Sequence, residues 1–229
     1  GHDGNRGEAV LWASQIGAAT EHLGAFQGHG NVAHPHGILI TWATITEGGV
    51  QVNAAGERFW NEAQGYSEAA RAVLSQAQGV AYAIFDWRIS QIAEQFEDFK
   101  RAKSEGAIKS AETLEELAED LGLPADTLCK TIADISPNST DRFGRTFGET
   151  VLSPPFCGVR VTGALFHTQG GLKVDTSARV ICKNNNLISN LYAGGGAACG
   201  VSGSGDSGYL SGNGLLAAVV LGRIAGNAS

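Results

Sequence analysis

The sequence has no methionine and no long apolar run. Its 229 residues include no Met, so the chain does not begin with an initiator, and we expect it to be a processed or excised piece of a longer protein. Apolar residues make up 43% and charged residues 17%, which are ordinary values for a folded chain. Because no apolar run approaches the roughly 20 residues that a membrane-spanning helix needs, we expect no membrane span.

Basic residues are also scarce, and the cysteines are isolated. The chain carries 16 Lys and Arg against 23 Asp and Glu, a net charge of −7, without a basic patch. Nucleic acids and anionic membranes are therefore poor candidates for partners. The cysteines lie far apart, without a C-x-x-C pair, which predicts reduced and mostly buried thiols and favours a cytoplasmic location. They are Cys129, Cys157, Cys182 and Cys199.

Glycine is abundant and concentrated near the end of the chain. It occurs 32 times, about twice its typical ~7% usage, and residues 194–226 contain 11 of these glycines. A strand, a Gly-rich loop and an apolar helix follow one another there. This order allows backbone N–H groups and the positive end of the helix dipole to face an electron-rich ligand, a phosphate or the edge of a cofactor ring. A flexible surface loop is the alternative. The chain contains neither a Rossmann G-x-G-x-x-G arrangement nor a P-loop.

The hydrophobic pattern predicts a mixed fold, α+β or α/β, in three segments. Residues 1–64 are β-rich, residues 65–153 are mostly helical, and residues 154–229 return to strands before the Gly-rich loop and a final helix. Thr113-Leu-Glu-Glu is a capping box that opens a helix ending near Gly122. The other predicted elements are helices at 8–18, 67–78, 90–103, 125–135 and 212–225, and strands at 38–43, 49–53, 80–86, 156–166, 172–175, 179–182 and 190–193.

Several motifs resemble the flavoprotein family of fumarate reductases and succinate dehydrogenases, which also contains 3-ketosteroid dehydrogenases. The C-terminal motifs are Asn190-Leu-Tyr-Ala-Gly-Gly-Gly-Ala-Ala-Cys-Gly-Val-Ser-Gly, Gly208-Tyr-Leu-Ser-Gly-Asn-Gly-Leu-Leu and Gly222-Arg-Ile-Ala-Gly. Earlier matches are Gly37-Ile-Leu-Ile-Thr, Gly48-Gly-Val-Gln-Val-Asn, Gly56-Glu-Arg-Phe-Trp-Asn-Glu, and His167-Thr-Gln-Gly-Gly with Val174-Asp-Thr. The resemblance implies FAD as cofactor, with residues 1–64 and 154–229 in an FAD domain and residues 65–153 in an inserted capping domain. It also implies a partner, the N-terminal FAD-binding half, which we expect to be missing here.

The resemblance also implies which residues face the cofactor. Gly195 and Gly196 would pass near the ribityl chain of the flavin. The start of the last helix would face the pyrimidine edge of the ring, where helix N–H groups stabilise the negative charge of reduced flavin. The residues concerned are Gly212, Asn213, Gly214, Leu215 and Leu216. Gly196 stands where family members often carry Glu, so one side-chain contact to the cofactor is expected to be absent.

On the substrate side, the chain departs from the fumarate reductase pattern. The positions of the acid Arg and of its Glu–Arg relay hold Tyr66, Trp42 and Ile45, and residues 206–209 replace the Arg that clamps the dicarboxylate. A dicarboxylate needs a forked guanidinium for bidentate binding. We therefore expect a small-molecule substrate that is neutral or singly charged, and not fumarate.

The remaining candidates are assigned by chemistry. Oxidation or reduction next to a carbonyl moves a hydride to or from flavin N5 and a proton on the adjacent carbon, so Tyr209 or Tyr66 would move the proton. His167 would hold the substrate oxygen, and His29 and Trp42 would contact the substrate. Each of these side chains has a structural alternative as a packed residue. The spacing of His22, His29, His34 and His36 matches no standard metal site.

Two functions follow from the sequence. The first is an FAD-dependent oxidoreductase acting on a C–C bond next to a carbonyl or carboxylate. The alternative is a non-catalytic fragment that cannot bind flavin without its missing half. The sequence predicts no oligomeric state.

Overall fold

The computed structural model describes residues 4–205, 210 and 212–228 of the chain, which divides into two compact units. The first combines residues 1–28 with residues 165–229, and the second comprises residues 29–164. The chain therefore passes from one unit to the other twice. Both units mix helix and strand, so the predicted mixed fold class is confirmed.

A six-stranded antiparallel sheet forms the centre of the second unit. Its strand order is β3-β2-β7-β5-β4, and β6 pairs with β7. All seven residues of β5 are buried, and β5 pairs with β7 from Val80 opposite Thr162 to Asp86 opposite Phe156. The strands are β2 (Phe26–Ala33), β3 (Ile38–Leu39), β4 (Val50–Val52), β5 (Val80–Asp86), β6 (Ile108–Ala111) and β7 (Phe156–Thr168).

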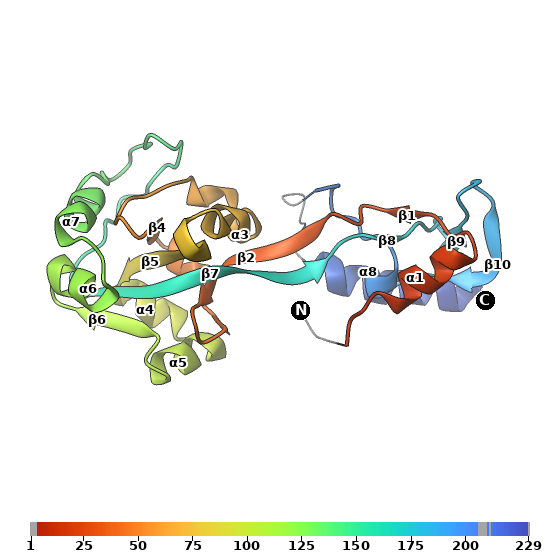
Figure 1. The fold of residues 1–229 in the computed structure, drawn as a ribbon, viewed down its shortest axis with the longest axis horizontal. Coiled ribbons are helices and arrows are strands. Elements are labelled where there is room, and N and C mark those ends of the chain that lie inside the picture. The colour runs from red at the N-terminus through yellow and green to blue at the C-terminus, as the bar shows by residue number, and fades with distance from the viewer. Residues whose placement is uncertain (1–3, 206–209, 211, 229) are drawn as a thin grey trace. The chain divides into compact units, whose positions relative to one another are not determined.

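Helices cover this sheet and create two hydrophobic clusters. Phe85, Ile89 and Phe99 belong to one cluster, and Leu117 and Leu128 belong to the other. Helices α6 and α7 pack against each other and shield the second cluster (Figure 1). The α-helices are α2 (Ala43–Thr46), α3 (Tyr66–Leu74), α4 (Trp87–Ala93), α5 (Glu97–Ser104), α6 (Leu114–Leu121) and α7 (Ala125–Ala133); short 3-10 turns occur at η1 (Glu62–Gln64) and η2 (Ala77–Gly79).

Local sequence signals define several of these elements. The hydroxyl oxygen of Thr113 accepts a hydrogen bond from the N–H of Glu116 at 3.2 Å, so the predicted N-cap of α6 is confirmed. Gly122 ends the helix in the left-handed conformation, with φ 69°. The predicted strand at residues 80–86 is confirmed residue for residue.

Several element predictions were wrong in detail: the helix expected at residues 67–78 ends at Leu74, and the strand expected at residues 172–175 ends at Leu172. Residues 90–103 do not form one helix, because Phe96 is extended (φ −99°, ψ 127°) and separates α4 from α5. Phe96 is consequently exposed, whereas Phe99 is buried. The strand expected at residues 38–43 stops after Leu39, and α2 begins at Ala43.

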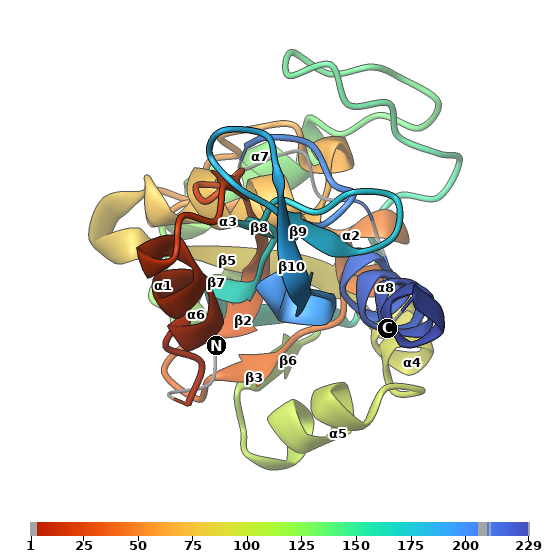
Figure 2. The same cartoon turned by 90° about the vertical axis from the view of Figure 1, so that its right-hand side faces the viewer.

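The first unit contains short strands and two longer helices. Strand β1 (Thr20–Glu21) pairs with β8 (Gly171–Leu172), and β9 (Arg179–Ile181) forms a hairpin with β10 (Leu187–Tyr192) that faces the viewer in Figure 2. The two helices are α1 (Glu8–Gln15) and α8 (Asn213–Ala228), and the 3-10 turn η3 (Gly195–Ala197) lies before α8 in the sequence. The core of this unit is small and consists mainly of Ala, Val and Leu side chains.

The borders of the compact units differ from the borders of the predicted segments. The sheet of the second unit takes β2, β3 and β4 from residues 1–64, β5 and β6 from residues 65–153, and β7 from residues 154–229. The borders at 64/65 and 153/154 followed changes in composition, whereas strand pairing joins residues across them.

Two expectations about composition can be compared with the structure. All four cysteines are free, as predicted, but only Cys157 is buried, so the expectation that most of them are buried was wrong. Among the described residues, no helix is both long and apolar enough to cross a membrane.

Candidate active site

The start of α8 is fixed by a hydrogen-bonded side-chain network. Asn213 is the first residue of α8 and only 1% exposed. Its side-chain oxygen accepts a hydrogen bond from the N–H of Val201 at 2.9 Å, and its amide nitrogen donates to the side-chain oxygen of Gln169. The amide nitrogen of Gln169 lies 3.1 Å from Nδ1 of His167. The network therefore ties His167 to the first turn of α8.

Glycines keep the backbone around this network bare. A Cβ at Gly200 would lie 2.6 Å from the amide nitrogen of Asn213, and a Cβ at Gly214 would lie 3.1 Å from Nε2 of His167. The first N–H groups of a helix have no partner within the helix, and the dipole makes this end positive. A bare, positive helix end beside a histidine suits the electron-rich edge of a cofactor ring.

The predicted cofactor residues divide into packed and exposed positions. Gly195 lies in η3 with φ 57°, and a Cβ there would meet the Cβ of Ala218 in α8 at 3.5 Å. Gly196 is exposed, and a Cβ there would have open space around it. Gly212 precedes α8 with φ 82°, whereas Leu215 and Leu216 are 80% and 52% exposed. The Gly-rich turn thus packs on α8, and the side chains of Leu215 and Leu216 point away from the core.

Tyr209 lies outside the described residues, as do the other positions of the segment expected to replace the dicarboxylate-binding Arg. The proposed proton-transfer role of Tyr209 therefore stays a prediction.

In the second unit, three predicted residues form an aromatic cluster. The ring of His29 stacks on that of Tyr66, with centroids 5.0 Å apart and planes 18° apart. Trp42 meets His29 edge-on at 5.8 Å and Tyr66 at 6.4 Å. The structure therefore brings Trp42 and Tyr66, at the positions of the expected relay Glu and acid Arg, together in an aromatic group, whereas Ile45, at the position of the relay Arg, is buried in the hydrophobic core. His167 belongs to the other unit.

His29 is neutral at physiological pH. Its side chain is buried, and this burial lowers its pKa from 6.5 to about 4. Its Nδ1 accepts a hydrogen bond from the N–H of Asn31 at 3.2 Å, which assigns the proton to Nε2. His29 thus has the protonation state of a hydrogen-bond donor to a carbonyl or carboxylate oxygen.

A buried polar network supports this cluster, and sequence reasoning missed most of it. The side-chain amide of Gln51 donates to the carbonyl of Gly30 at 2.8 Å and accepts from the indole N–H of Trp60 at 3.0 Å. Asn31 donates to the hydroxyl of Thr44 at 3.0 Å. These bonds hold β2, β4 and the beginning of α2 in register around His29. The partners are 9 to 21 residues apart, so local sequence patterns give no signal for them.

Glu62 is a structural residue. It is 1% exposed, accepts a hydrogen bond from the backbone N–H of Gln51 at 3.0 Å, and pairs with both Arg58 and Arg145. Burial alone would lower the pKa of Arg58, but hydrogen bonds and charges from Glu62 and Asp141 raise it. The two arginines and the two carboxylates therefore compensate one another and anchor the turn between β4 and α3.

Comparisons with known proteins place this geometry among flavoproteins. A family model described as an FAD binding domain matches residues 2–215. A probable fumarate reductase, Ifc3, of Shewanella frigidimarina is 30% identical over 96% of this chain and 37% of its own length. An NADH:acrylate oxidoreductase of Vibrio harveyi is 37% identical over 84% of this chain and 20% of its own length. A 3-oxosteroid 1-dehydrogenase of Mycobacterium tuberculosis is 27% identical over 89% of this chain.

Solved structures agree with these sequence matches. The open conformation of a flavocytochrome c3 fumarate reductase superposes with a TM-score of 0.74 and 29% identity, covering 96% of this chain and 39% of that one. The chain thus spans about a fifth to two fifths of the length of these relatives.

Proposed function

We propose that this chain, which belongs to the FAD binding domain family, carries the flavin-facing and substrate-facing residues of an FAD-dependent oxidoreductase. The proposed reaction oxidises or reduces a C–C bond next to a carbonyl or carboxylate. When bound, FAD supplies the hydride acceptor or donor at its N5 atom. The residues of this chain supply orientation, charge stabilisation and proton transfer.

The observation that carries this proposal is the network of His167, Gln169 and Asn213. It joins a histidine that can hold a substrate oxygen to the helix end that suits the flavin ring. Rigid links of this kind fix the distance between two reactants, which is a major source of rate enhancement. The first-turn N–H groups of α8 would stabilise negative charge on the ring.

We expect the substrate to be bound and protonated or deprotonated by His29, Trp42 and Tyr66, each with a different role. His29 would donate a hydrogen bond from Nε2, and the indole of Trp42 would pack against the substrate. Tyr66, stacked on His29, is one candidate to move the proton, and Tyr209 is the other.

The aromatic cluster supports a substrate with at most one negative charge. Burying a carboxylate without a paired cation is costly, and within this cluster Tyr66 supplies a phenol ring where a dicarboxylate enzyme is expected to carry its acid Arg. The names of two relatives agree with this assignment, since acrylate carries one carboxylate and a 3-oxosteroid is neutral. We propose an α,β-unsaturated monocarboxylate or ketone as substrate, rather than fumarate.

The substitution Asn213→Ala in the complete protein tests the role of the network of His167, Gln169 and Asn213. Removing this side chain breaks the links to Val201 and Gln169, so FAD occupancy or the rate of flavin reoxidation by substrate should fall at least tenfold. Absorption spectra and rapid mixing measure both quantities. Asn227→Ala, at an exposed position of the same helix, is the matched control and should retain both. Equal flavin content and rates in the two variants would contradict the proposal.

A second candidate is that these 229 residues cannot retain flavin by themselves. It is favoured by the apolar surface of the first unit, where Leu215, Val219 and Trp12 are 80%, 70% and 60% exposed. Large apolar helix faces are normally covered by other polypeptide. We propose that a further FAD-binding segment covers α8 in the complete protein.

Titration of FAD into the isolated chain tests this second candidate. The expected result is no change in flavin absorbance or fluorescence, whereas the complete protein is yellow as purified. Stoichiometric FAD binding by the isolated chain would overturn it.

A further inference from the structure

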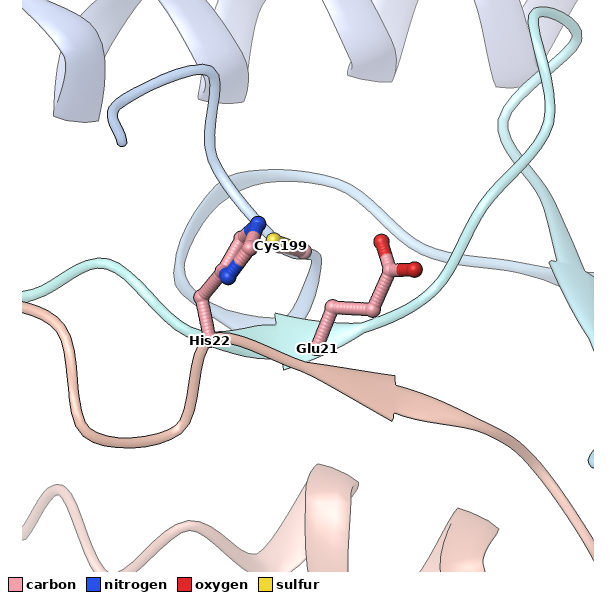
Figure 3. Close-up of side chains that lie close together, drawn as sticks. All are labelled: Glu21, His22 and Cys199. Carbon is pink, nitrogen blue, oxygen red and sulfur yellow. The ribbon is translucent and has the colours of Figure 1, made fainter. Parts of the chain in front are cut away.

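Three side chains with metal-binding atoms lie together in the first unit, and the proposed reaction uses none of them. They are Glu21, His22 and Cys199, and one ligand atom from each lies within 4.8 Å of the other two. Figure 3 shows the carboxylate and the imidazole projecting in the same direction from neighbouring residues, with the thiol beside the imidazole. His22 is exposed and the other two are half-buried, so the group can be reached from solvent.

The backbone holds these three residues in place through one shared strand. Glu21 pairs with Gly171 in the β1–β8 ladder. On the other side of β8, the N–H of Cys199 donates to the carbonyl of Leu172 at 2.9 Å. A Cβ at Gly171 would lie 2.5 Å from the carbonyl carbon of Ala198, so this close approach requires glycine. The spacing between the thiol and the β1 side chains is therefore built into the fold.

The conformation of His22 brings its ring to the same side as Glu21. Successive residues of an extended strand point to opposite faces. His22 instead has φ 52°, in the left-handed region that histidine seldom adopts, and it starts a turn in which the N–H of Ala25 donates to its carbonyl at 2.8 Å. Because of this dihedral angle, the side chains of Glu21 and His22 point to the same side instead of to opposite faces of the strand.

The donor set matches the preferences of zinc. Sulfur, imidazole nitrogen and carboxylate oxygen bind Zn²⁺ at about 2.3, 2.0 and 2.1 Å, so tetrahedral ligand atoms lie about 3.3–3.6 Å apart. The observed ligand atoms lie within 4.8 Å of one another, so the side chains would have to rotate about their χ angles to reach that spacing. We propose that Glu21, His22 and Cys199 bind one Zn²⁺ ion, with a water molecule in the fourth position. On binding, the Cys199 thiol forms an S–Zn bond and releases its proton to solvent.

Lys173 competes with the metal for Glu21. Its ammonium group lies 2.7 Å from Oε1 of Glu21. Because both side chains of this pair are partly exposed, the lysine can turn into solvent when a cation binds. A neutral side chain at position 173 should therefore strengthen metal binding. The bound ion would connect β1 to the Gly-rich segment that contains Cys199.

The experiment is titration of the complete protein with CoCl₂ and ZnCl₂. Cobalt bound to a thiolate gives an intense ligand-to-metal charge-transfer band, and zinc should displace it at a stoichiometry of one. We expect Cys199→Ser to abolish the band and to weaken zinc binding at least a hundredfold. His22→Asn should weaken it at least tenfold while keeping the left-handed backbone, which asparagine tolerates. Lys173→Gln should tighten it several-fold.

Cys182→Ser and His36→Gln are the matched controls, because they remove a half-buried thiol of the same unit and an exposed imidazole. Both should bind zinc as the unmodified protein does. The proposal is overturned if the unmodified protein binds no stoichiometric Co²⁺ or Zn²⁺. It is also overturned if Cys199→Ser keeps the charge-transfer band, or if His22→Asn, with an unchanged circular dichroism spectrum, binds zinc as tightly as the controls.

Discussion

At the scale of single residues, His29 has the most informative environment. It is 6% exposed, and its burial lowers its pKa to about 4, so the folded protein keeps the ring neutral over most of the pH range. The same burial that suits His29 to donate a hydrogen bond also makes the protein sensitive to acid.

The shifted pKa of His29 predicts how stability depends on pH. Between pH 6.5 and pH 4 the unfolded chain protonates His29 and the folded protein does not, so stability falls as the pH drops through this window, by at most about 3 kcal/mol. His29→Gln should remove this part of the slope. Urea unfolding at a series of pH values measures it, with His36→Gln as the exposed control. Equal slopes for His29→Gln and the unmodified protein would contradict the assignment.

Glu62 supports a second prediction at this scale. Glu62→Ala leaves Arg58 and Arg145 buried without their shared carboxylate, which should cost about 3–5 kcal/mol of unfolding free energy. Glu57→Ala, at an exposed position five residues earlier in the sequence, should change stability by less than about 0.5 kcal/mol. Chemical denaturation of both variants is the measurement. A similar, small loss in both would show that Glu62 is not the anchor of this turn.

At the scale of elements, the sequence predicts best where local chemistry decides. Thr113 and Gly122 mark the two ends of α6, and the apolar run at residues 80–86 marks a fully buried strand. The helix expected over residues 90–103 failed because Asp86 caps α4 from outside the periodic segment and Phe96 is extended between the two helices. Periodicity continues through such a break and does not reveal it.

The N-cap of α6 gives a quantitative prediction for one element. Thr113→Ala removes the bond to the N–H of Glu116 and should cost about 1 kcal/mol, whereas Thr113→Ser should keep most of it. Thermal or urea unfolding distinguishes the two variants. If both have the stability of the unmodified protein, the cap does not contribute.

At the scale of the whole molecule, the sequence predicts family and cofactor but not the side-chain networks. The Gly-rich motifs consist of residues that are contiguous in the sequence, so FAD could be predicted from them. The match to the FAD binding domain family agrees with this prediction. The bonds of Gln51 to Gly30 and of Asn213 to Gln169 join residues 21 and 44 positions apart, and only the folded chain reveals them. The same holds for Cys199 and His22, whose proximity depends on two strand pairings.

The substrate is the central claim, because Tyr66 stands at the position of the acid Arg expected in a dicarboxylate enzyme and Trp42 at that of its relay Glu, and both pack with His29 in one aromatic group. The most direct measurement is the rate at which the reduced flavin of the complete protein is reoxidised by acrylate-type monocarboxylates, by neutral α,β-unsaturated ketones and by fumarate. We predict that a compound of the first or second class reoxidises the flavin at least a hundredfold faster than fumarate. A fumarate rate that equals or exceeds the others would contradict the account.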